Sequence, residues 1–208
     1  MPLTSKDDQL IDSIIKKYPR SRSAIMPLLH LAQARDGYVT PESIEVIANK
    51  LSLETAEVTA VATFYTQYKR KPVGEYHVGV CTNTLCAVMG GDAIFDALKD
   101  HLGVENDEVT SDGKVSVEHI ECNAACDYAP VVMVNWEFYD NQTVQSAKDL
   151  VDSCRAGNPP APTRGPNKLP TWKENSELLA GINDGKAGEG VQAGEATLLG
   201  LKIAKGGK

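Results

Sequence analysis

The chain has 208 residues, of which 42% are hydrophobic and 24% charged, as in a globular protein with a buried core. No run of about 18 apolar residues occurs, so the sequence predicts no membrane-spanning helix. The polar, acidic start "MPLTSKDDQLIDS" indicates neither a secretory signal nor a mitochondrial transit peptide. We therefore expect a cytoplasmic protein, in which paired cysteines more often bind metal or take part in redox chemistry than form structural disulfides.

The net charge of −7 is unevenly distributed along the chain. Residues 74–157 contain 4 basic and 15 acidic side chains, a net charge of −11, whereas residues 1–73 and 158–208 each have a net charge of +2. Such an acidic segment repels phosphate backbones, and the sequence therefore argues against nucleic acid as a partner.

Four short helices are expected within residues 1–73, which we take as an N-terminal helical domain. Apolar residues recur there at helical spacing, with proline or glycine near the expected ends. In the last helix, Val58, Val61 and Tyr65 are expected to face the core. The expected helices run from about residue 5 to Tyr18, over residues 24–37, over residues 41–51 and from Glu54 to about Tyr65.

Residues 74–157 change to a mixed pattern of strands and helices. Strands are predicted at residues 76–80, 114–121 and 131–135, with a short return strand around Phe138–Tyr139. Helices are predicted at residues 92–102 and 143–157. The order strand, helix, strand, strand, helix, with one crossover, predicts a small α/β sheet domain.

Two cysteine pairs lie within this acidic segment. Cys81 and Cys86 belong to "VCTNTLC", and Cys122 and Cys126 belong to "ECNAAC". The first cysteine of each pair ends a predicted strand, and the second lies in the loop that follows. If the two strands are neighbours in the sheet, all four sulfurs meet at one end of it. Four thiolates so close together repel one another and require a cation.

Spacing alone leaves several occupants open. A redox disulfide favours Cys-x-x-Cys, which neither pair has. Both spacings fall within the range that zinc sites use, although this segment has a hydrophobic core of its own and needs no metal to fold. A 2Fe-2S cluster suits the longer loops, whose small residues let backbone N–H groups approach the sulfurs. The spacing favours iron–sulfur over zinc, with a disulfide or a chance arrangement behind both.

A family resemblance adds to this interpretation. The stretches "AIMPLLHLAQARDGYVTPESIEVIA", "VATFYTQY", "KPVGEYHVGVCTNTLC" and "ECNAACDYAPVVMVN" occur in the order found in the thioredoxin-fold 2Fe-2S subunit of NADH:quinone oxidoreductase, respiratory complex I. The chain resembles this family over roughly residues 8 to 156. Leu85 stands where many relatives have proline, and Ala124 where many have glycine. The resemblance implies that one 2Fe-2S cluster per chain is bound by Cys81, Cys86, Cys122 and Cys126.

The fold class implied is α/β. A thioredoxin-like 2Fe-2S ferredoxin domain at residues 74–157 would follow the small helical bundle and precede an extended C-terminal tail. The function implied is electron transfer within the respiratory chain. The cluster would exchange single electrons with FMN in a neighbouring flavoprotein subunit that also binds NADH.

No catalytic residue is expected in this chain, and FMN and NADH are expected only in the partner subunit. The chain would be a subunit of a quinone-reducing translocase, held at the cytoplasmic face of the membrane by the other complex I subunits without inserting itself. Two alternatives stay open. One is a diaphorase subunit of an NAD-linked hydrogenase or formate dehydrogenase, and the other is a zinc-stabilised interaction module.

The remaining residues give simpler expectations. Residues 158–208 contain nine glycines and five prolines and few large apolar side chains, which predicts an extended or disordered tail. Cys154 lies on the apolar face of the last predicted helix and is expected to be a buried small hydrophobe. Pro130 occupies a place where thioredoxin folds often have a cis-proline, and the sequence does not decide its isomer. Ordinary core or solvated side chains are expected for His77, His101 and His119.

Overall fold

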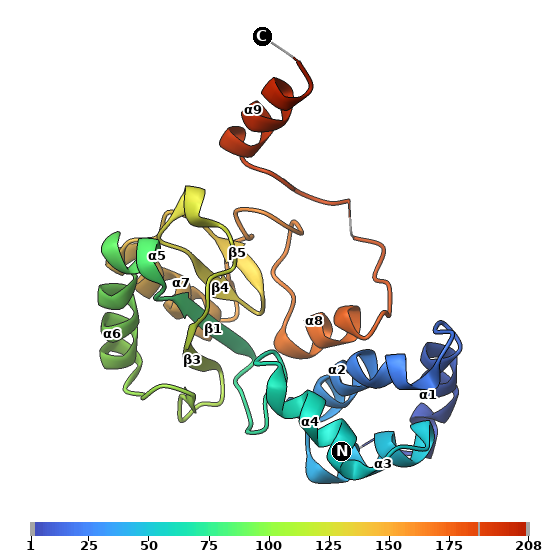
Figure 1. The fold of residues 1–208 in the computed structure, drawn as a ribbon. Helices are drawn as coiled ribbons and strands as arrows, with labels where there is room; N and C mark the ends of the chain where they lie inside the picture. The colour runs from blue at the N-terminus through green and yellow to red at the C-terminus, as the bar shows by residue number, and fades with distance from the viewer. Residues whose placement is uncertain (1–2, 187, 207–208) are drawn as a thin grey trace. The chain divides into compact units, whose positions relative to one another are not determined.

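The computed structural model describes residues 3–186 and 188–206, which form two compact units. The first unit comprises the chain up to Glu75 together with Pro170–Asp184. The second comprises Tyr76–Leu169 together with the residues from Gly185 onward. Figure 1 shows that the first unit is helical and that the second contains the sheet. Each unit therefore includes part of the C-terminal region.

The first unit is built around the helix α2, Ile25–Asp36. The side chains of Leu28, Leu29 and Leu31 are fully buried, and α2 is covered by its neighbours on most sides. Beyond its last turn Gly37 has φ +86°, a left-handed conformation that glycine adopts without strain. The other helices of the N-terminal segment are η1 (Ser5–Asp7), α1 (Asp8–Ile15), η2 (Ser21–Ala24), α3 (Pro41–Leu51) and α4 (Thr55–Phe64).

Local caps explain where α3 and α4 begin. The hydroxyl oxygen of Thr40 accepts a hydrogen bond of 3.1 Å from the backbone N–H of Ser43, and Pro41 starts α3. Glu54 and Glu57 form a capping box at the start of α4. The expected helices are confirmed, but the expectation that Tyr65 faces the core is wrong. Tyr65 follows the end of α4 and is 43% exposed.

The C-terminal region adds a further helix to the first unit. Helix α8, Trp172–Leu179, lies beside α2 (Figure 1). Trp172 is 2% exposed, and its indole N–H donates a hydrogen bond of 2.6 Å to the carbonyl of Gly37. Arg35 also forms an ion pair of 2.6 Å with Glu177. The expectation of an extended tail is therefore wrong here, because one large aromatic side chain supplies the buried area that the composition lacks.

The second unit contains a five-stranded sheet in the order β2-β3-β1-β4-β5. Strands β1 and β3 are parallel and the other pairs are antiparallel. The helix α6, Gly91–Leu102, forms the crossover between the parallel strands, as the sequence predicts. The short strand β2 was not expected. The strands are β1 (Tyr76–Cys81), β2 (Glu108–Val109), β3 (Val115–Ile120), β4 (Val132–Val134) and β5 (Glu137–Tyr139).

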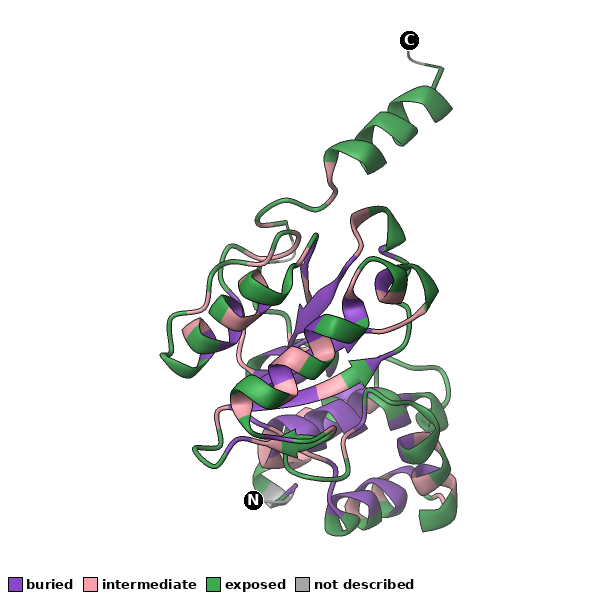
Figure 2. Ribbon diagram, turned by 90° about the vertical axis from the view of Figure 1, so that its left-hand side faces the viewer, coloured by how far each residue is buried: buried purple, intermediate pink, exposed green. Residues whose placement is uncertain are grey.

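One face of this sheet is covered by α6 and by α7, Val144–Arg155. Valines of β1, β3 and β4 pack there against Ile94, Leu98 and Val151, and the central strands appear as buried in Figure 2. Cys154 is fully buried in the same core, and burial raises its pKa to about 12, which confirms that it is a small core residue. Val144, in contrast, is more exposed than its position on the predicted face suggests.

The last described residues form the helix α9, Glu195–Ala204. The side chains of Leu198, Leu199, Leu201 and Ile203 on it are exposed. This helix is a second departure from the extended tail that the composition predicts. Within the described part of the chain, no helix combines the length and the apolar composition needed to cross a membrane.

Replacement of Trp172 tests the role of α8. Trp172→Ala removes a fully buried ring and its hydrogen bond to Gly37, so the free energy of unfolding of the first unit should fall by about 3–5 kcal/mol. Leu179→Ala is the matched control, because Leu179 lies on the same helix and is 40% exposed. Urea unfolding followed by circular dichroism would compare the two. Equal losses for both variants would contradict the buried position of Trp172.

Candidate functional site

The parallel pairing of β1 and β3 brings the two cysteine pairs to one edge of the sheet. Cys81 is the last residue of β1 and lies opposite Ile120, the last residue of β3. Cys122 follows Ile120 by two residues. Because parallel strands end at the same edge, the expected convergence of Cys81 and Cys122 is confirmed.

The second cysteine of each pair lies in a short helical turn rather than in an irregular loop. Cys86 is buried in α5, Thr84–Val88, and Cys126 begins the 3₁₀ turn η3, Cys126–Tyr128. The sulfurs of Cys122 and Cys126 are 3.5 Å apart. These turns contain only five and three residues, which is too few for an apolar period to reveal them in the sequence.

A polar contact joins the two cysteine segments. The side-chain amide of Asn83, which precedes α5, donates a hydrogen bond of 3.1 Å to the carboxylate of Glu121, which precedes Cys122. Asn83 stands at the N-cap position of α5, so the contact connects the start of that helix to the second pair. This hydrogen bond links the two cysteine segments without involving a thiol.

The thiols lie close enough to affect one another's pKa. The pKa of Cys81 is raised to about 11, chiefly by burial and in addition by the neighbouring Cys86 and Cys122, while a backbone hydrogen bond from Asn83 opposes the rise. The pKa of Cys126 is raised chiefly by its contact with Cys122, with a contribution from Cys81. Each shift disfavours the thiolate, and a bound cation would reverse it.

The donor set suits a cluster bridged by sulfide. Cys81 and Cys86 are buried and Cys122 and Cys126 are exposed, so the thiols form an inner and an outer half. The backbone N–H of Ala124 points to the sulfur of Cys122 at 3.4 Å, an interaction that tunes iron–sulfur centres. Among residues 3–186 and 188–206, no group of three or more His, Cys, Asp or Glu side chains is arranged to hold a single metal ion.

Ala124 has a left-handed backbone with φ +56°. This conformation costs most residues about 1–2 kcal/mol and glycine almost nothing. A glycine at this position would therefore adopt the turn with less strain than Ala124 does. Leu85 lies in the first turn of α5, a place where proline is also tolerated. Both departures from the family pattern are thus compatible with the observed backbone.

Gly91 is a site residue that sequence reasoning missed. It starts α6, and a Cβ atom there would press against the carbonyl oxygens of Cys81 and Cys86, the latter at 2.9 Å. Only glycine lets α6 approach the backbone of both inner cysteines so closely. The sequence signal was the pair Gly90–Gly91 immediately before a predicted helix, because one glycine can serve as the N-cap, whereas a second at the first helical position has no such advantage unless something lies close.

The other singled-out residues have ordinary environments. The ring of His77 lies 3.0 Å from the hydroxyl of Ser116 and 2.8 Å from a carboxylate oxygen of Glu118. His101 and Asp152 form a pair at 2.9 Å on neighbouring helices. The peptide bond before Pro130 is cis, which settles the isomer that the sequence left open.

The close approach at Gly91 predicts a selective effect on the site. Gly91→Ala should force α6 away from the inner cysteines and lower the unfolding free energy of the chain by about 1–3 kcal/mol, as overpacking does. Gly200→Ala is the control, because Gly200 is also helical and open space surrounds it. Thermal unfolding measures both. An unchanged midpoint for Gly91→Ala would contradict the contact.

Comparisons with known proteins agree with this geometry. The model of the family described as "Thioredoxin-like [2Fe-2S] ferredoxin" matches residues 11–155. The chain is 61% identical over 193 residues to a protein of Mycobacterium tuberculosis that is named as a subunit of NADH-quinone oxidoreductase. That match covers 92% of this chain and 76% of the relative. A protein of the same name from Rickettsia bellii is 44% identical over 153 residues, covering 72% of this chain and 92% of the relative.

Among solved structures, a chain of an NAD⁺-reducing [NiFe]-hydrogenase in the air-oxidised state is similar in fold. Its TM-score is 0.58 at 19% sequence identity, and the match covers 65% of this chain and 23% of that chain. At this identity the similarity concerns the fold alone. The family model and the identity to the curated relatives extend over most of the sequence, and the chain belongs to the thioredoxin-like [2Fe-2S] ferredoxin family.

Proposed function

We propose that the chain is the electron-transfer subunit of an NADH-quinone oxidoreductase and that its four clustered cysteines bind one [2Fe-2S] cluster. The observation that carries the proposal is the convergence of two cysteine pairs at the ends of the parallel strands β1 and β3. Family membership and the name of the 61% identical relative support it. The proposed ligands are Cys81, Cys86, Cys122 and Cys126.

A bound cluster would supply one-electron transfer at this edge of the sheet. The chain's own residues provide four thiolates to hold the irons and the N–H of Ala124 to stabilise a sulfur ligand. Ile120, Val131 and Met133 form an apolar core around Cys81 and Cys86 and exclude water from the inner half. The outer half, with Cys122 and Cys126, faces the solvent.

The electron donor in this proposal is reduced FMN in a neighbouring flavoprotein subunit, which also binds NADH. This chain would accept single electrons from the flavin and could return them, without breaking a substrate bond. The other subunits would hold the assembly at the cytoplasmic face of the membrane.

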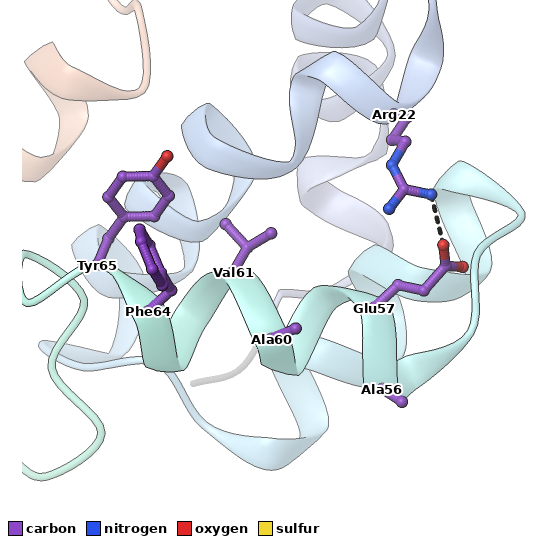
Figure 3. Close-up of a pocket in the computed structure, with 7 residues that line it drawn as sticks. All are labelled: Arg22, Ala56, Glu57, Ala60, Val61, Phe64 and Tyr65. Carbon is purple, nitrogen blue, oxygen red and sulfur yellow. Dashed lines mark hydrogen bonds and ion pairs between the residues drawn. The ribbon is translucent and has the colours of Figure 1, made fainter.

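The surface of α4 is the part of the first unit that we assign to subunit contacts. A groove of about 540 Å³ lies there, and the ion pair of Arg22 and Glu57 is at one end of it (Figure 3). At the other end lie the rings of Phe64 and Tyr65, 5.0 Å apart. Phe64 is 78% exposed, and aromatic residues are enriched at protein interfaces. The other lining residues are Ala56, Ala60 and Val61.

A charge placed in this groove tests the assignment. Phe64→Asp should reduce the recovery of the flavoprotein subunit with the affinity-tagged chain by about tenfold or more, because a hot-spot aromatic contributes at least about 2 kcal/mol. Leu199→Asp is the control, an exposed apolar residue on α9. Co-purification from cells that express both subunits gives the measurement. Equal recovery for both variants would remove α4 from the interface.

Two other functions make different predictions. The second candidate is a diaphorase subunit of an NAD-linked hydrogenase or formate dehydrogenase, since a hydrogenase chain shares this fold. Identification of the co-purifying catalytic subunits separates it from the first. A zinc-stabilised interaction module would use the same four thiols. Zinc protein is colourless and has no EPR signal, whereas a reduced [2Fe-2S] cluster has one.

Metal analysis tests the proposed cofactor. Protein purified anaerobically should contain two iron and two sulfide per chain, and dithionite should produce a rhombic S = ½ EPR signal. Cys86→Ala should lose the cluster, and Cys154→Ala should retain it, since Cys154 lies in the core on the opposite face of the sheet. One zinc per chain without sulfide would contradict the proposal.

A further inference from the structure

Arg164 follows the region matched by the family model. Its largely buried side chain lies beside β5, near the turn that begins at Cys126. Its guanidinium forms two parallel bonds of 2.8 Å to the carboxylate of Asp140. The side chains of Arg164 and Asp140 are 18% and 6% exposed. Such a bidentate pair fixes the plane of the guanidinium, and its low exposure protects it from solvent and salt.

The same guanidinium contacts two aromatic rings. Its central carbon lies 4.2 Å from the ring centre of Phe138 and 5.2 Å from that of Tyr128, both within the range of cation–π attraction. Phe138 packs against the core around Cys81 and Cys86. Tyr128 ends the turn η3, two residues after Cys126. Arg164 therefore contacts one ring that packs against the core around the inner cysteines and one ring in the turn that begins at Cys126.

Backbone contacts fix the position of the Arg164 segment. Thr163 donates its backbone N–H to the carbonyl of Phe138 at 2.8 Å and its hydroxyl to Asp140 at 2.9 Å. The next residue but one, Gly165, donates to the carbonyl of Val191 at 2.8 Å. These hydrogen bonds hold the segment against β5 independently of the contacts that the side chain of Arg164 makes.

The C-terminal residues reach the same aromatic ring. The backbone N–H of Ala196 at the start of α9 donates a hydrogen bond of 3.2 Å to the hydroxyl of Tyr128. The hydroxyl of Thr197 lies 3.5 Å from Asp127. Tyr128 thus receives one contact from Arg164 on its ring and another on its hydroxyl.

We propose that Arg164 is a positioning residue that, through the ring of Tyr128, holds the segment of Cys122 and Cys126 in the conformation that binds the cluster. The inference rests on the proposed [2Fe-2S] function. The outer cysteines are exposed and their segment contains the left-handed Ala124, so apart from the buried Ala125 and the short turn η3 it has little burial or regular structure of its own. The fixed guanidinium supplies that order from a residue 38 positions beyond Cys126.

The test compares two arginines with the same type of partner. Arg155 also donates two hydrogen bonds to an aspartate, both to one carboxylate oxygen of Asp112, at 2.8 and 2.9 Å. Asp112 precedes β3, so this pair lies at the opposite end of that strand from Cys122. Arg164→Gln and Arg155→Gln would be made in the full chain and reconstituted with iron and sulfide. Arg164→Lys and Tyr128→Phe complete the series.

Two readouts are measured on the holoprotein. The first is the rate at which the visible absorbance of the cluster disappears in excess chelator, and the second is the set of g-values of the reduced cluster. Arg164→Gln should accelerate cluster loss by about tenfold or more and shift the g-values, as changes behind metal ligands do. Arg164→Lys should give an intermediate rate of cluster loss, because lysine keeps the positive charge but lacks the planar guanidinium that binds both carboxylate oxygens. Tyr128→Phe should have a rate of cluster loss and g-values close to those of the wild type, because it keeps the ring that Arg164 contacts.

The outcomes distinguish a failure of the role proposed for Arg164 from a failure of the proposed function. If Arg164→Gln and Arg155→Gln change cluster loss and g-values equally, the role of Arg164 is overturned while the proposed function stands. If Arg164→Gln does not fold, the loss rate and g-values of Arg164→Lys decide, and wild-type values there overturn the inference. If the wild-type chain binds no iron and sulfide, the proposed function fails and the inference fails with it.

Discussion

The parallel pairing of β1 with β3 is the constraint on which the site depends. A parallel pair ends at one edge of the sheet, so the segments that leave it there are neighbours although Cys81 and Cys122 are 41 residues apart. The crossover helix α6 must then pass close to the backbone of the first pair, which requires Gly91. The apolar face under α6 and α7 fixes the register of the two strands and with it the positions of the thiols.

Both units incorporate residues from the C-terminal region. In the first, Trp172 completes the core around α2. In the second, the Arg164 segment lies against β5 and contacts the turn after Cys126. Glycine and proline between these points let the chain run without regular structure from one anchored side chain to the next. The C-terminal region is therefore attached to each unit by a few large or charged residues, each of which contacts a specific partner.

The regular elements could be predicted from sequence because each has its own local pattern. The helices of the first unit have apolar periods and caps, such as Thr40 before α3, and the buried strands β1 and β4 are short apolar runs bounded by turns. The convergence of the cysteines also followed from local pattern, since each pair comes directly after a strand. The four proposed ligands needed only that topology and the family resemblance.

The features that were missed depend on distant partners. Strand β2 exists because β3 pairs with it, and α5, with five residues, is too short to show an apolar repeat. The average composition of residues 158–208 concealed Trp172, whose single ring is enough to anchor a helix. Gly91 acquires its role when α6 lies against the backbone of Cys81 and Cys86, which the pair Gly90–Gly91 only hints at. Arg164 acquires its role when segments far away in sequence lie against it, and no pattern within a short window contains that information.

Anomalous diffraction from crystals of the anaerobic holoprotein tests the central claim most directly. Data collected at the iron and zinc absorption edges would locate any metal relative to the sulfurs of Cys81, Cys86, Cys122 and Cys126. The account predicts two adjacent iron atoms, one held by two of these sulfurs and the other by the remaining two. A single peak at the zinc edge would contradict the account. Iron atoms that leave one or more of the four cysteines unbound would contradict it as well.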